Sequence, residues 1–377
     1  MLSLIDGLSA KGFIPYVVTP ETGRLIDELN DRNIPVTIIP FKRWIHEPAV
    51  QGNLGLHITS YAKKLLSSII RWQKNREVVK EIQKIVEIEK IDLIYTNSVV
   101  TPIGAMLAKA CKLPHIWHLR EFGDMDFCLK WDFGHRFSRG YISSKSDAVI
   151  CVSESIKNHF VQPSAEKKFH VVYNGIATDS DFSLFEKRLL SVNRPESKLF
   201  TFAIVGSIQP AKGQESAIRA LAEVHKTRPD VKLIVAGGGE TAKLEDLVVE
   251  FGLNESVTFT GHVDDPYEIY EQTDVVLMCS HSEGMGRVTV EAMAAGKPVI
   301  GYDNAGTSEL IVHGETGLLY SGGYMELAAL MLDLMDDCKL YKKLAVNGFQ
   351  FAKSRFTTEH YVEQITKILN QVTKHKN

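Results

Sequence analysis

The sequence predicts an α/β protein with two doubly wound domains, each built on a parallel sheet. Short apolar runs rich in β-branched residues alternate with segments of helical periodicity, as in βαβ units. The alternation stops in a charged stretch and then begins again, so the chain has two similar halves. A chain of 377 residues is also too long for one ordinary core. We therefore expect two Rossmann-like domains that face each other across a cleft.

The first half contains the opening helix and the first set of predicted strands. Residues 1–11 predict an amphipathic helix that ends at Gly12. The predicted strands are residues 14–18, 36–39, 91–95, 115–118 and 148–152, with a periodic helical segment at 78–89. A doubly wound domain usually begins with a strand and a glycine-rich turn. We therefore expect that the first strand of this domain is missing.

The second half repeats the pattern after a hinge. Residues 170–176 predict a strand that ends in a turn at Asn174 and Gly175, and the charged stretch after it has no clear periodicity. The strands predicted next are residues 200–205, 231–236, 257–260, 275–278 and 298–301. We expect an N-terminal domain at 1–175, a hinge or linker at 176–198 and a C-terminal domain at 199–350. A C-terminal helix within 351–377 is expected to pack back toward the N-terminal domain.

Composition and charge narrow the functional classes. Hydrophobic residues make up 44% and charged residues 24%, the balance of a globular protein. The formal charge of −3 argues against a general nucleic-acid binder. Residues 1–175 carry 23 Lys and Arg against 18 Asp and Glu, whereas the remainder carries 20 against 28. The basic first half suits an anionic partner or an anionic membrane surface, although most single lysines simply face solvent.

Cysteine usage and hydropathy predict a cytoplasmic protein. The five cysteines are scattered, odd in number and without metal-ligand spacing, which indicates neither a disulfide framework nor a zinc site. No apolar run approaches the length of about 18 residues that spans a bilayer, and the N-terminus does not resemble a signal peptide. We expect a soluble or peripheral protein, with the inner face of the membrane as a candidate location.

The strongest motif follows the strand at residues 275–278. It runs through a loop that contains Glu283, Gly284, Met285 and Gly286 into a helix that carries Glu291. Free N–H groups around 285–288, at the start of that helix, are suited to bind an anion such as a diphosphate. A carboxylate offers only acceptors, so Glu283 suits sugar hydroxyls and Glu291 a ribose diol. A lone Glu in a helix would more often face solvent, but the whole segment favours a site.

A second motif, residues 205–213, also joins a strand to a helix. Lys212 lies where the helix begins and is placed to neutralise phosphate. Arg287, beside the Glu283 loop, is a candidate for a second positive charge, although a residue in that position can instead form a salt bridge at a helix end.

A third motif is the Trp-His-Leu-Arg-Glu of residues 117–121, just past a strand of the first half. A buried histidine at a strand end is more often structural than catalytic.

Together these segments resemble the retaining family 4 glycosyltransferases, the GT-B "glycosyl transferases group 1" class. The two glutamates eight residues apart, Glu283 and Glu291, match the donor-site motif of that family. Further matches are spread over most of the chain, namely residues 95–98, 117–121, 152–153, 172–176, 205–213, 261–263, 306–310 and 313–319. Each match is weak alone, and together they are specific.

The resemblance implies a nucleotide diphosphate-sugar as co-substrate and two groups of site residues. His118 and Glu283 are the implied catalytic residues. The implied donor-binding residues are Gly206, Ser207, Lys212, Val263, Gly284, Met285, Gly286, Arg287, Val288 and Glu291. The family commonly has an arginine at the position of Ser207, so the usual basic pair is weakened here. The implied acceptor side, in the N-terminal domain, comprises Asn97, Arg120 and Glu121. The loop of Trp44 is a separate candidate for contact with the acceptor.

The resemblance also implies retaining transfer to a glycan or lipid-linked acceptor, in cell-surface polysaccharide synthesis, without a metal or other cofactor. Asp124 and Asp126 spell the Asp-x-Asp metal motif of another glycosyltransferase fold, but the context of that fold is missing. Residues 237–239 are three glycines after a strand, which is weak evidence for a dinucleotide site. Two alternatives remain open: a catalytically degenerate nucleotide-sugar-binding module, and a GT-B phosphorylase or epimerase.

A possible membrane-contacting surface lies in residues 58–84, where apolar and basic side chains are mixed. Such a segment can rest on an anionic membrane, which suits a lipid-linked acceptor. An amphipathic helix packed on its own core is an equally good interpretation of the same pattern.

Overall fold

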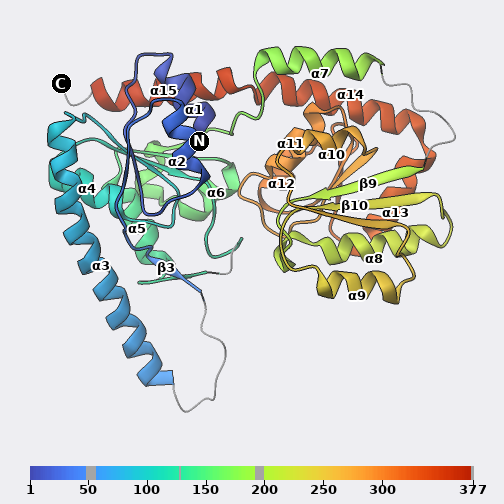
Figure 1. Ribbon diagram of the computed structural model, residues 1–377, viewed down its shortest axis with the longest axis horizontal. Coiled ribbons are helices and arrows are strands. Elements are labelled where there is room, and N and C mark those ends of the chain that lie inside the picture. Colours follow the sequence, from blue (N-terminus) through green and yellow to red (C-terminus); the bar gives the residue numbers. More distant parts are fainter. Residues whose placement is uncertain (48–56, 127–128, 192–198, 375–377) are drawn as a thin grey trace. The chain divides into compact units, whose positions relative to one another are not determined.

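The computed structural model describes residues 1–47, 57–126, 129–191 and 199–374 (Figure 1). The chain forms two compact units. Unit 1 comprises Met1–Tyr173 and Tyr361–Asn377, and unit 2 comprises Asn174–His360. The chain therefore leaves unit 1 after residue 173 and returns to it near the C-terminus.

Unit 1 contains a parallel four-stranded sheet with the order β4-β5-β7-β8 and a parallel pair, β1-β2. A short antiparallel pair, β3-β6, joins two loops. The strands are β1 (Val17–Thr19), β2 (Val36–Ile38), β3 (Ile45–His46), β4 (Ile94–Asn97), β5 (His115–Leu119), β6 (Lys130–Trp131), β7 (Ala148–Cys151) and β8 (Phe169–Val171). The helices are α1 (Leu2–Ser9), α2 (Arg24–Asp31), α3 (His57–Ile88), α4 (Ile103–Cys111), α5 (His135–Lys145), α6 (Glu154–Phe160), the 3₁₀ helix η2 (Pro163–Lys168) and most of α15 (Thr358–Lys374).

Helices cover both faces of the unit 1 sheet, as a fully buried parallel sheet requires. On one face, α1 and α15 lie side by side and bury a cluster that includes Leu4, Ile116, Ile150 and Ile365 (Figure 1). On the other face, α3 and α4 bury a second cluster around Ile82. The strands β5 and β7 are buried along their whole length, which explains why neither shows the apolar–polar alternation of a half-exposed strand.

Unit 2 has a six-stranded parallel sheet with the order β11-β10-β9-β12-β13-β14. The strands are β9 (Phe200–Val205), β10 (Val231–Ala236), β11 (Val257–Gly261), β12 (Val275–Met278), β13 (Val299–Tyr302) and β14 (Leu318–Tyr320). The helices are α7 (Asp179–Ser191), the 3₁₀ helix η3 (Pro210–Lys212), α8 (Gln214–His225), α9 (Ala242–Glu250), α10 (Tyr267–Glu271), α11 (Arg287–Ala294), α12 (Ala305–Leu310), α13 (Tyr324–Asp336) and α14 (Cys338–Arg355).

The strand order of unit 2 creates a switch point between β9 and β12. From β9 the chain builds the sheet outward through β10 and β11, then returns to the other side of β9 and continues through β12 to β14. In open α/β sheets a ligand binds beyond the carboxyl ends of the strands at such a point. Two loops flank it, one after β9 and one after β12.

The structure confirms the expected α/β class with parallel sheets and differs from the sequence-based description in details. Residues 176–198 were expected to be a linker, but α7 forms there and belongs to unit 2, where Phe182 is fully buried against Phe349. The periodicity of α7 is hidden because its first turn is rich in Asp and Ser. The short strand β14 was not predicted. Within the described ranges no helix is both long and apolar enough to cross a membrane.

Candidate functional site

An ion pair links the two loops at the unit 2 switch point. Nζ of Lys212, after β9, lies 2.6 Å from Oε1 of Glu283, after β12. The two side chains are 29% and 16% exposed, so both are partly open to solvent. An ammonium group has three N–H donors, of which Glu283 uses one. Lys212 therefore keeps donors for a second anionic group at the same place.

The backbone at Gly213 fixes the position of Lys212. Gly213 has φ +74° and caps the N-terminus of α8. A Cβ at this position would collide with the carbonyl oxygen of Cys279, so the β9 loop lies directly against the β12 loop. The N–H of His281 also donates to the carbonyl of Ala211 at 3.1 Å. These close backbone contacts require glycine and hold Lys212 beside Glu283.

The loop after β12 is buried and packed by its neighbours. Gly284, Met285 and Gly286 are buried, and Gly286 has φ +74° where it begins α11. The N–H of Gly306 donates to the carbonyl of Glu283 at 3.0 Å, and Sδ of Met285 accepts from the backbone N–H of Asn174 at 3.2 Å. The sequence motifs at 172–176 and 306–310 therefore support the predicted donor loop in space.

Two threonine hydroxyls surround Gly286. A Cβ built on Gly286 would lie 3.4 Å from Oγ1 of Thr307 and 3.6 Å from Oγ1 of Thr289. Both hydroxyl groups are buried, and neither has a hydrogen-bond partner among the described residues. Together with the N–H groups at the start of α11, they make this loop rich in unused donors, which suits an oxyanion.

Glu291 lies in α11, four residues after the helix begins at Arg287, and its carboxylate is held on both sides. Oε1 accepts from Nη2 of Arg287 at 2.9 Å, and Oε2 accepts from the hydroxyl of Tyr270 at 3.3 Å. The residue is 8% exposed. Burial raises the pKa of Tyr270, and the nearby Glu291 charge raises it further. The tyrosine therefore stays a hydrogen-bond donor to Glu291 at neutral pH.

The remaining predicted donor residues belong to the loops after β9 and β11 and to the first turn of α11. Gly206 donates its N–H to the carbonyl of Ala236 at 2.8 Å, and Ser207 is exposed. Val263 packs against Ala203 and Ala236 at the ends of β9 and β10. Arg287 is exposed and forms an ion pair with Glu291. Val288 is partly buried in the first turn of α11.

The glycine triplet at 237–239 is explained by close backbone packing. A Cβ at Gly237 would collide with the carbonyl of Gly206, and a Cβ at Gly239 would lie 2.7 Å from the carbonyl of Ile208. The triplet therefore packs against the β9 loop. This packing explains the three glycines without a dinucleotide site.

Four predicted residues of unit 1 gather at the carboxyl ends of β4 and β5. His118 is fully buried, and its Nδ1 lies 2.7 Å from the hydroxyl of Tyr95. Its Nε2 has no hydrogen-bond partner among the described residues. Burial lowers the pKa of His118, and the charge of Arg120 lowers it further. The imidazole is therefore neutral at pH 7.

The other three residues make specific contacts around His118. Nε of Arg120 donates to Oδ1 of Asn97 at 2.6 Å, and Nη2 lies 2.9 Å from the hydroxyl of Tyr361. Oε1 of Glu121 accepts from the hydroxyl of Ser98 and from the N–H of Val99. Burial raises the pKa of Glu121. Glu121 thus holds the loop after β4 in place, in addition to any contact with an acceptor.

Trp44, which was predicted on the acceptor side, has a buried side chain in the structure. Trp44 is 2% exposed, and its Nε1 donates to the carbonyl of Val99 at 2.7 Å. Its ring stacks on Trp117 at 5.5 Å and meets Tyr141 edge to face. The side chain belongs to an aromatic core cluster. Trp44 lies directly before β3, and its backbone N–H donates to the carbonyl of Val100 at 3.1 Å, a burial that the sequence did not indicate.

Sequence reasoning missed the groups that orient the predicted ones. These are Tyr270 on Glu291, Gln214 on the carbonyl of Ser207 at 3.0 Å, Tyr361 on Arg120, and the hydroxyls of Thr289 and Thr307. A signal for Tyr270 exists in the Pro-Tyr-Glu-Ile-Tyr of residues 266–270, just after the 261–263 match. Tyr361 lies 241 residues from Arg120, and nothing local in the sequence connects them.

Two family models match the chain, one in each half. The model described as Glycosyltransferase Family 4 matches residues 1–180, and the model described as Glycosyl transferases group 1 matches residues 186–351. Together they leave a short junction and the C-terminal segment unmatched.

Curated relatives carry the same kind of name. An uncharacterised glycosyltransferase of Methanocaldococcus jannaschii is 28% identical over 96% of this chain and 97% of its own length. The capsular polysaccharide biosynthesis glycosyltransferase CapM of Staphylococcus aureus is 28% identical over 60% of this chain and 62% of its own. The N-acetyl-α-D-glucosaminyl L-malate synthase of Bacillus anthracis is 29% identical, with 61% of each chain covered.

Solved structures share the fold over nearly the whole chain. The Anabaena protein HepE, solved in complex with UDP and glucose, has a TM-score of 0.71 and 25% identity and covers 98% of this chain and 95% of its own. A glycosyltransferase of Rickettsia africae has a TM-score of 0.73 at 18% identity, with 99% of this chain and 94% of its own covered. The second likeness concerns the fold alone.

Proposed function

The chain belongs to glycosyltransferase family 4 and is a nucleotide-sugar-binding transferase, and from this premise we propose that it transfers a sugar with retention of anomeric configuration. The donor is a nucleotide diphosphate-sugar and the acceptor is a glycan or a lipid-linked glycan. The observation that carries the proposal is the Lys212–Glu283 pair at the unit 2 switch point, beside the start of α11.

The proposed roles follow from the charge that develops in the reaction. Breaking the bond between sugar and phosphate leaves negative charge on the diphosphate. Lys212, Arg287 and the N–H groups at 285–288 lower the energy of that charge, the type of effect that is usually largest in catalysis. The departing phosphate takes the acceptor's proton on the same face of the sugar, so no enzyme nucleophile is assigned and no metal is required at this place.

The remaining contacts orient the donor. Glu283 accepts hydrogen bonds from the sugar hydroxyls, and Glu291, held by Arg287 and Tyr270, accepts from the ribose diol. In unit 1, His118 with its neutral imidazole is assigned a catalytic role toward the donor sugar. Arg120, Glu121 and Asn97 serve the acceptor side, while Trp44 supports them from the core.

UDP is the first nucleotide to test, because HepE was solved with UDP. A role in cell-surface polysaccharide synthesis is supported by the likeness to CapM. Gly206, Ser207 and Val263 are proposed to lie along the nucleotide, where backbone groups and small side chains leave room for the ring. GDP remains the alternative, because the side chains of the β11 loop do not distinguish uracil from guanine.

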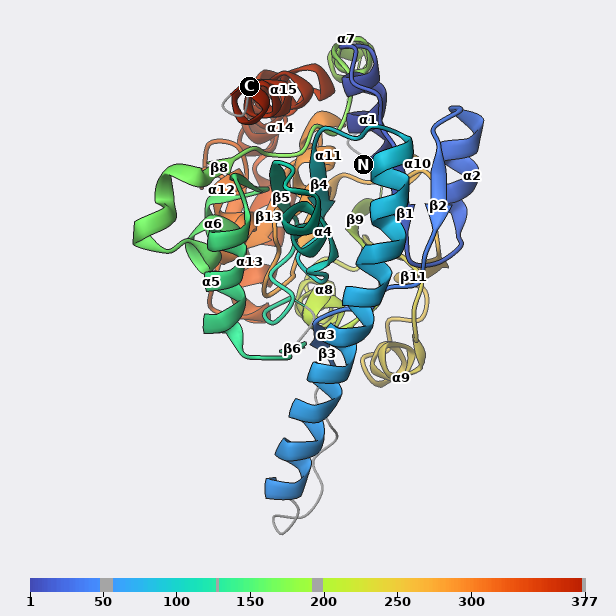
Figure 2. The same cartoon turned by 90° about the vertical axis from the view of Figure 1, so that its left-hand side faces the viewer.

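A peripheral membrane contact is proposed through the N-terminal half of α3. Leu65, Leu66, Ile69 and Ile70 are 40–58% exposed and lie on one face of the helix. Exposed Lys63 and Lys64 accompany them. Both views show this half of α3 extending away from the unit 1 sheet (Figures 1 and 2). Such a surface suits an anionic bilayer that carries a lipid-linked acceptor.

The experiment that tests the donor site is thermal unfolding of the chain with UDP, with GDP and without nucleotide. Ligand at 100 times its dissociation constant should stabilise the protein by about 2.7 kcal/mol. We expect stabilisation by one nucleotide in the wild type and its loss in Lys212→Ala and Glu291→Ala. Lys343→Ala is the matched control, because Lys343 forms an equally short ion pair with Glu315 on the surface.

Product analysis separates the reaction classes. A transferase needs a second sugar or lipid as acceptor, whereas a phosphorylase needs free phosphate and an epimerase acts on the nucleotide sugar alone. The anomeric configuration of the product, read by NMR, tests retention. Stabilisation by nucleotide without transfer or hydrolysis would support the catalytically degenerate alternative, and an inverted product would contradict the proposed mechanism.

A further inference from the structure

Three metal-binding side chains meet in unit 1, at a place that the proposed transfer reaction does not use. They are Asp124 in the loop after β5, His135 at the first residue of α5, and His159 near the end of α6. One ligand atom from each residue lies within 4.8 Å of the other two. The rings of His135 and His159 are 4.2 Å apart, centroid to centroid.

The three residues come from separate segments, so the sequence spacing did not reveal them. The Asp-x-Asp at residues 124–126 was discounted as a metal motif, and the structure divides its two members. Asp126 accepts from the N–H groups of Phe122 and Gly123 at 2.8 and 2.7 Å and thereby shapes the loop. Asp124 faces the histidines instead, with Oδ1 2.9 Å from Nε2 of His159.

A second contact orients the Asp124 carboxylate. Nε1 of Trp131 donates to Oδ2 of Asp124 at 3.0 Å, which directs Oδ1 toward His159. Metal-binding carboxylates are commonly held in this way by a hydrogen bond to the oxygen that does not bind the metal. Trp131 is itself buried, in β6, so the arrangement is rigid on this side.

His135 presents a nitrogen that the described residues leave unused. Its Nε2 is buried and has no hydrogen-bond partner among them. A buried polar atom without a partner costs stability unless a ligand or water supplies the bond. An imidazole nitrogen without a hydrogen-bond partner is available to bind a metal ion.

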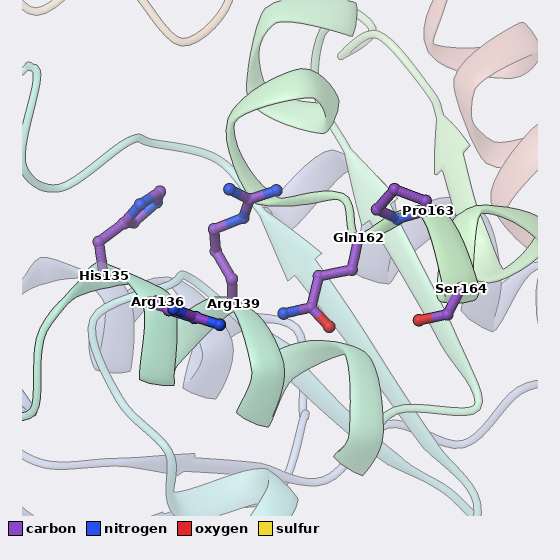
Figure 3. Close-up of a pocket in the computed structure, with 6 residues that line it drawn as sticks. All are labelled: His135, Arg136, Arg139, Gln162, Pro163 and Ser164. Carbon is purple, nitrogen blue, oxygen red and sulfur yellow. The ribbon is translucent and has the colours of Figure 1, made fainter.

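The surroundings give an ion access from solvent. The side chains of His159 and Asp124 are 17% and 24% exposed. His135 also lines a hollow of about 440 Å³ between α5 and the start of η2, together with Arg136, Arg139 and Gln162 (Figure 3). Nη2 and Nε of Arg139 contact the carbonyls of Val161 and Phe160, so this guanidinium is held by the chain.

We propose that Asp124, His135 and His159 bind a divalent transition-metal ion, with zinc as the best match, that ties the β5 loop to α5 and α6. Two imidazoles and one carboxylate are a zinc-type ligand set, with water completing the four ligands. Zinc bonds of about 2.0–2.2 Å require ligand atoms roughly 3.3–3.6 Å apart, so modest side-chain rotation closes the site. The bound ion replaces the His159–Asp124 hydrogen bond and takes up Nε2 of His135.

The test is metal binding by the whole chain after chelator treatment, with the cysteines kept reduced by a phosphine. Titration calorimetry with Zn²⁺ should give one site per chain, and Zn²⁺ should raise the unfolding midpoint. Cobalt should bind with visible d–d bands and without thiolate charge-transfer absorption. We expect His135→Phe, His159→Phe and Asp124→Asn each to weaken Zn²⁺ binding at least tenfold.

Two controls separate metal binding from folding. His135→Phe keeps the ring packing on Trp131 and Phe160 and removes an unused nitrogen, so without metal it should unfold no earlier than the wild type. His262→Phe removes the histidine of an exposed His–Asp pair that is not joined by a third metal-binding side chain in the part of the chain that the structure describes. It should leave binding unchanged. Absence of one-to-one binding by the wild type, unchanged binding in His135→Phe and His159→Phe, or thiolate bands with cobalt would each overturn the proposal.

Discussion

The two histidines of β5 differ in how their ring nitrogens are used. His115 uses both, with Nε2 2.8 Å from the hydroxyl of Thr96 and Nδ1 2.8 Å from the carbonyl of Lys145. His118 uses Nδ1 on Tyr95 and leaves Nε2 without a described partner. His115 is therefore satisfied by the fold, whereas His118 has a nitrogen available for a ligand. This difference favours the predicted role of His118 and gives His115 a structural one.

Burial of His115 predicts acid sensitivity. It lowers the pKa of His115 from 6.5 to about 4. Below pH 6.5 the unfolded chain binds a proton that the folded chain does not, so stability falls as the pH falls from 6.5 toward 4. Between pH 7 and pH 5 this histidine alone should cost about 2 kcal/mol of unfolding free energy. Urea unfolding at the two pH values measures the loss.

The variant His115→Gln keeps a side chain that can donate and accept but does not titrate. It should show a smaller loss between pH 7 and pH 5 than the wild type. His262→Gln, at an exposed histidine, is the control and should behave like the wild type. Equal pH dependence of His115→Gln and wild type would show that the acid sensitivity arises elsewhere.

The turn from η3 into α8 is the element that places Lys212, and it depends on Gly213. Gly213→Ala requires a non-glycine residue at φ +74° and brings its Cβ against the carbonyl of Cys279. We expect a loss of about 1–3 kcal/mol of stability and, in addition, weaker stabilisation by nucleotide because Lys212 moves. Denaturant unfolding and the nucleotide thermal shift measure the two effects.

Gly252→Ala is the matched comparison for this substitution. Gly252 has φ +66°, but a Cβ there would meet nothing within 4 Å. It should therefore show the cost of the left-handed backbone without the collision, about 1–2 kcal/mol, and leave the nucleotide effect intact. If both alanine variants weakened nucleotide binding equally, the proposed positioning by Gly213 would be wrong.

The exposed apolar face of α3 predicts binding to anionic vesicles. Leu66→Ser with Ile70→Ser removes two of its side chains without touching the buried face, where Val79 and Ile82 pack. We expect co-sedimentation of the wild type with vesicles of anionic lipid and a clear loss in the double variant. High salt should weaken the binding, because each lysine near the surface contributes about 1 kcal/mol electrostatically.

A matched double variant in unit 2 is the control for this test. Val249→Ser with Val346→Ser changes two exposed apolar side chains of unit 2 and should leave vesicle binding unchanged. Equal sedimentation of all three proteins, or equal sedimentation with neutral vesicles, would contradict the assignment to α3.

Over the molecule, the sequence predicts buried regular elements better than side-chain orientation in loops. The bounds predicted for β9, β10 and β12 agree with the structure, because these strands lie inside a sheet and are apolar apart from Thr201 and Lys232. The strand β14 has only three residues, too few to show an apolar pattern in the sequence. The polar first turn of α7 conceals the periodicity of that helix.

The same limit applies to the site. Lys212 and Glu283 were predicted from local motifs, and the structure brings them together because both strands end at one switch point. Trp44 lies directly before β3 with its side chain buried, and nothing local in the sequence indicates this burial. Tyr361 and the Asp124–His135–His159 cluster depend on contacts between distant segments, which one sequence does not reveal.

The return of the chain to unit 1 makes the stability of that unit depend on its last residues. Tyr361, Val362, Ile365, Ile368 and Leu369 of α15 are all buried in the unit 1 core beside Leu4, Ile116 and Ile150. Each such side chain contributes roughly 1.5–3 kcal/mol, and their sum is comparable to the whole stability of a typical domain. A chain that ends at residue 360 should therefore have an unfolded or aggregating unit 1.

Unit 2 has its own core and should survive this truncation. Its six strands and the cluster around Phe202, Leu221 and Met331 belong to residues 174–360. Limited proteolysis of the truncated chain should leave a resistant fragment close to that range, and the fragment should still be stabilised by the nucleotide that stabilises the whole chain. In the full chain, Ile365→Ala should lower the unfolding free energy of unit 1 by about 2–5 kcal/mol. Gln371→Ala, at an exposed position of α15, should leave that free energy unchanged. If the truncated chain no longer bound nucleotide, the Lys212–Glu283 site would require unit 1 in order to form. If it still bound nucleotide, donor binding would belong to unit 2 alone, and unit 1 would be needed for acceptor binding and turnover.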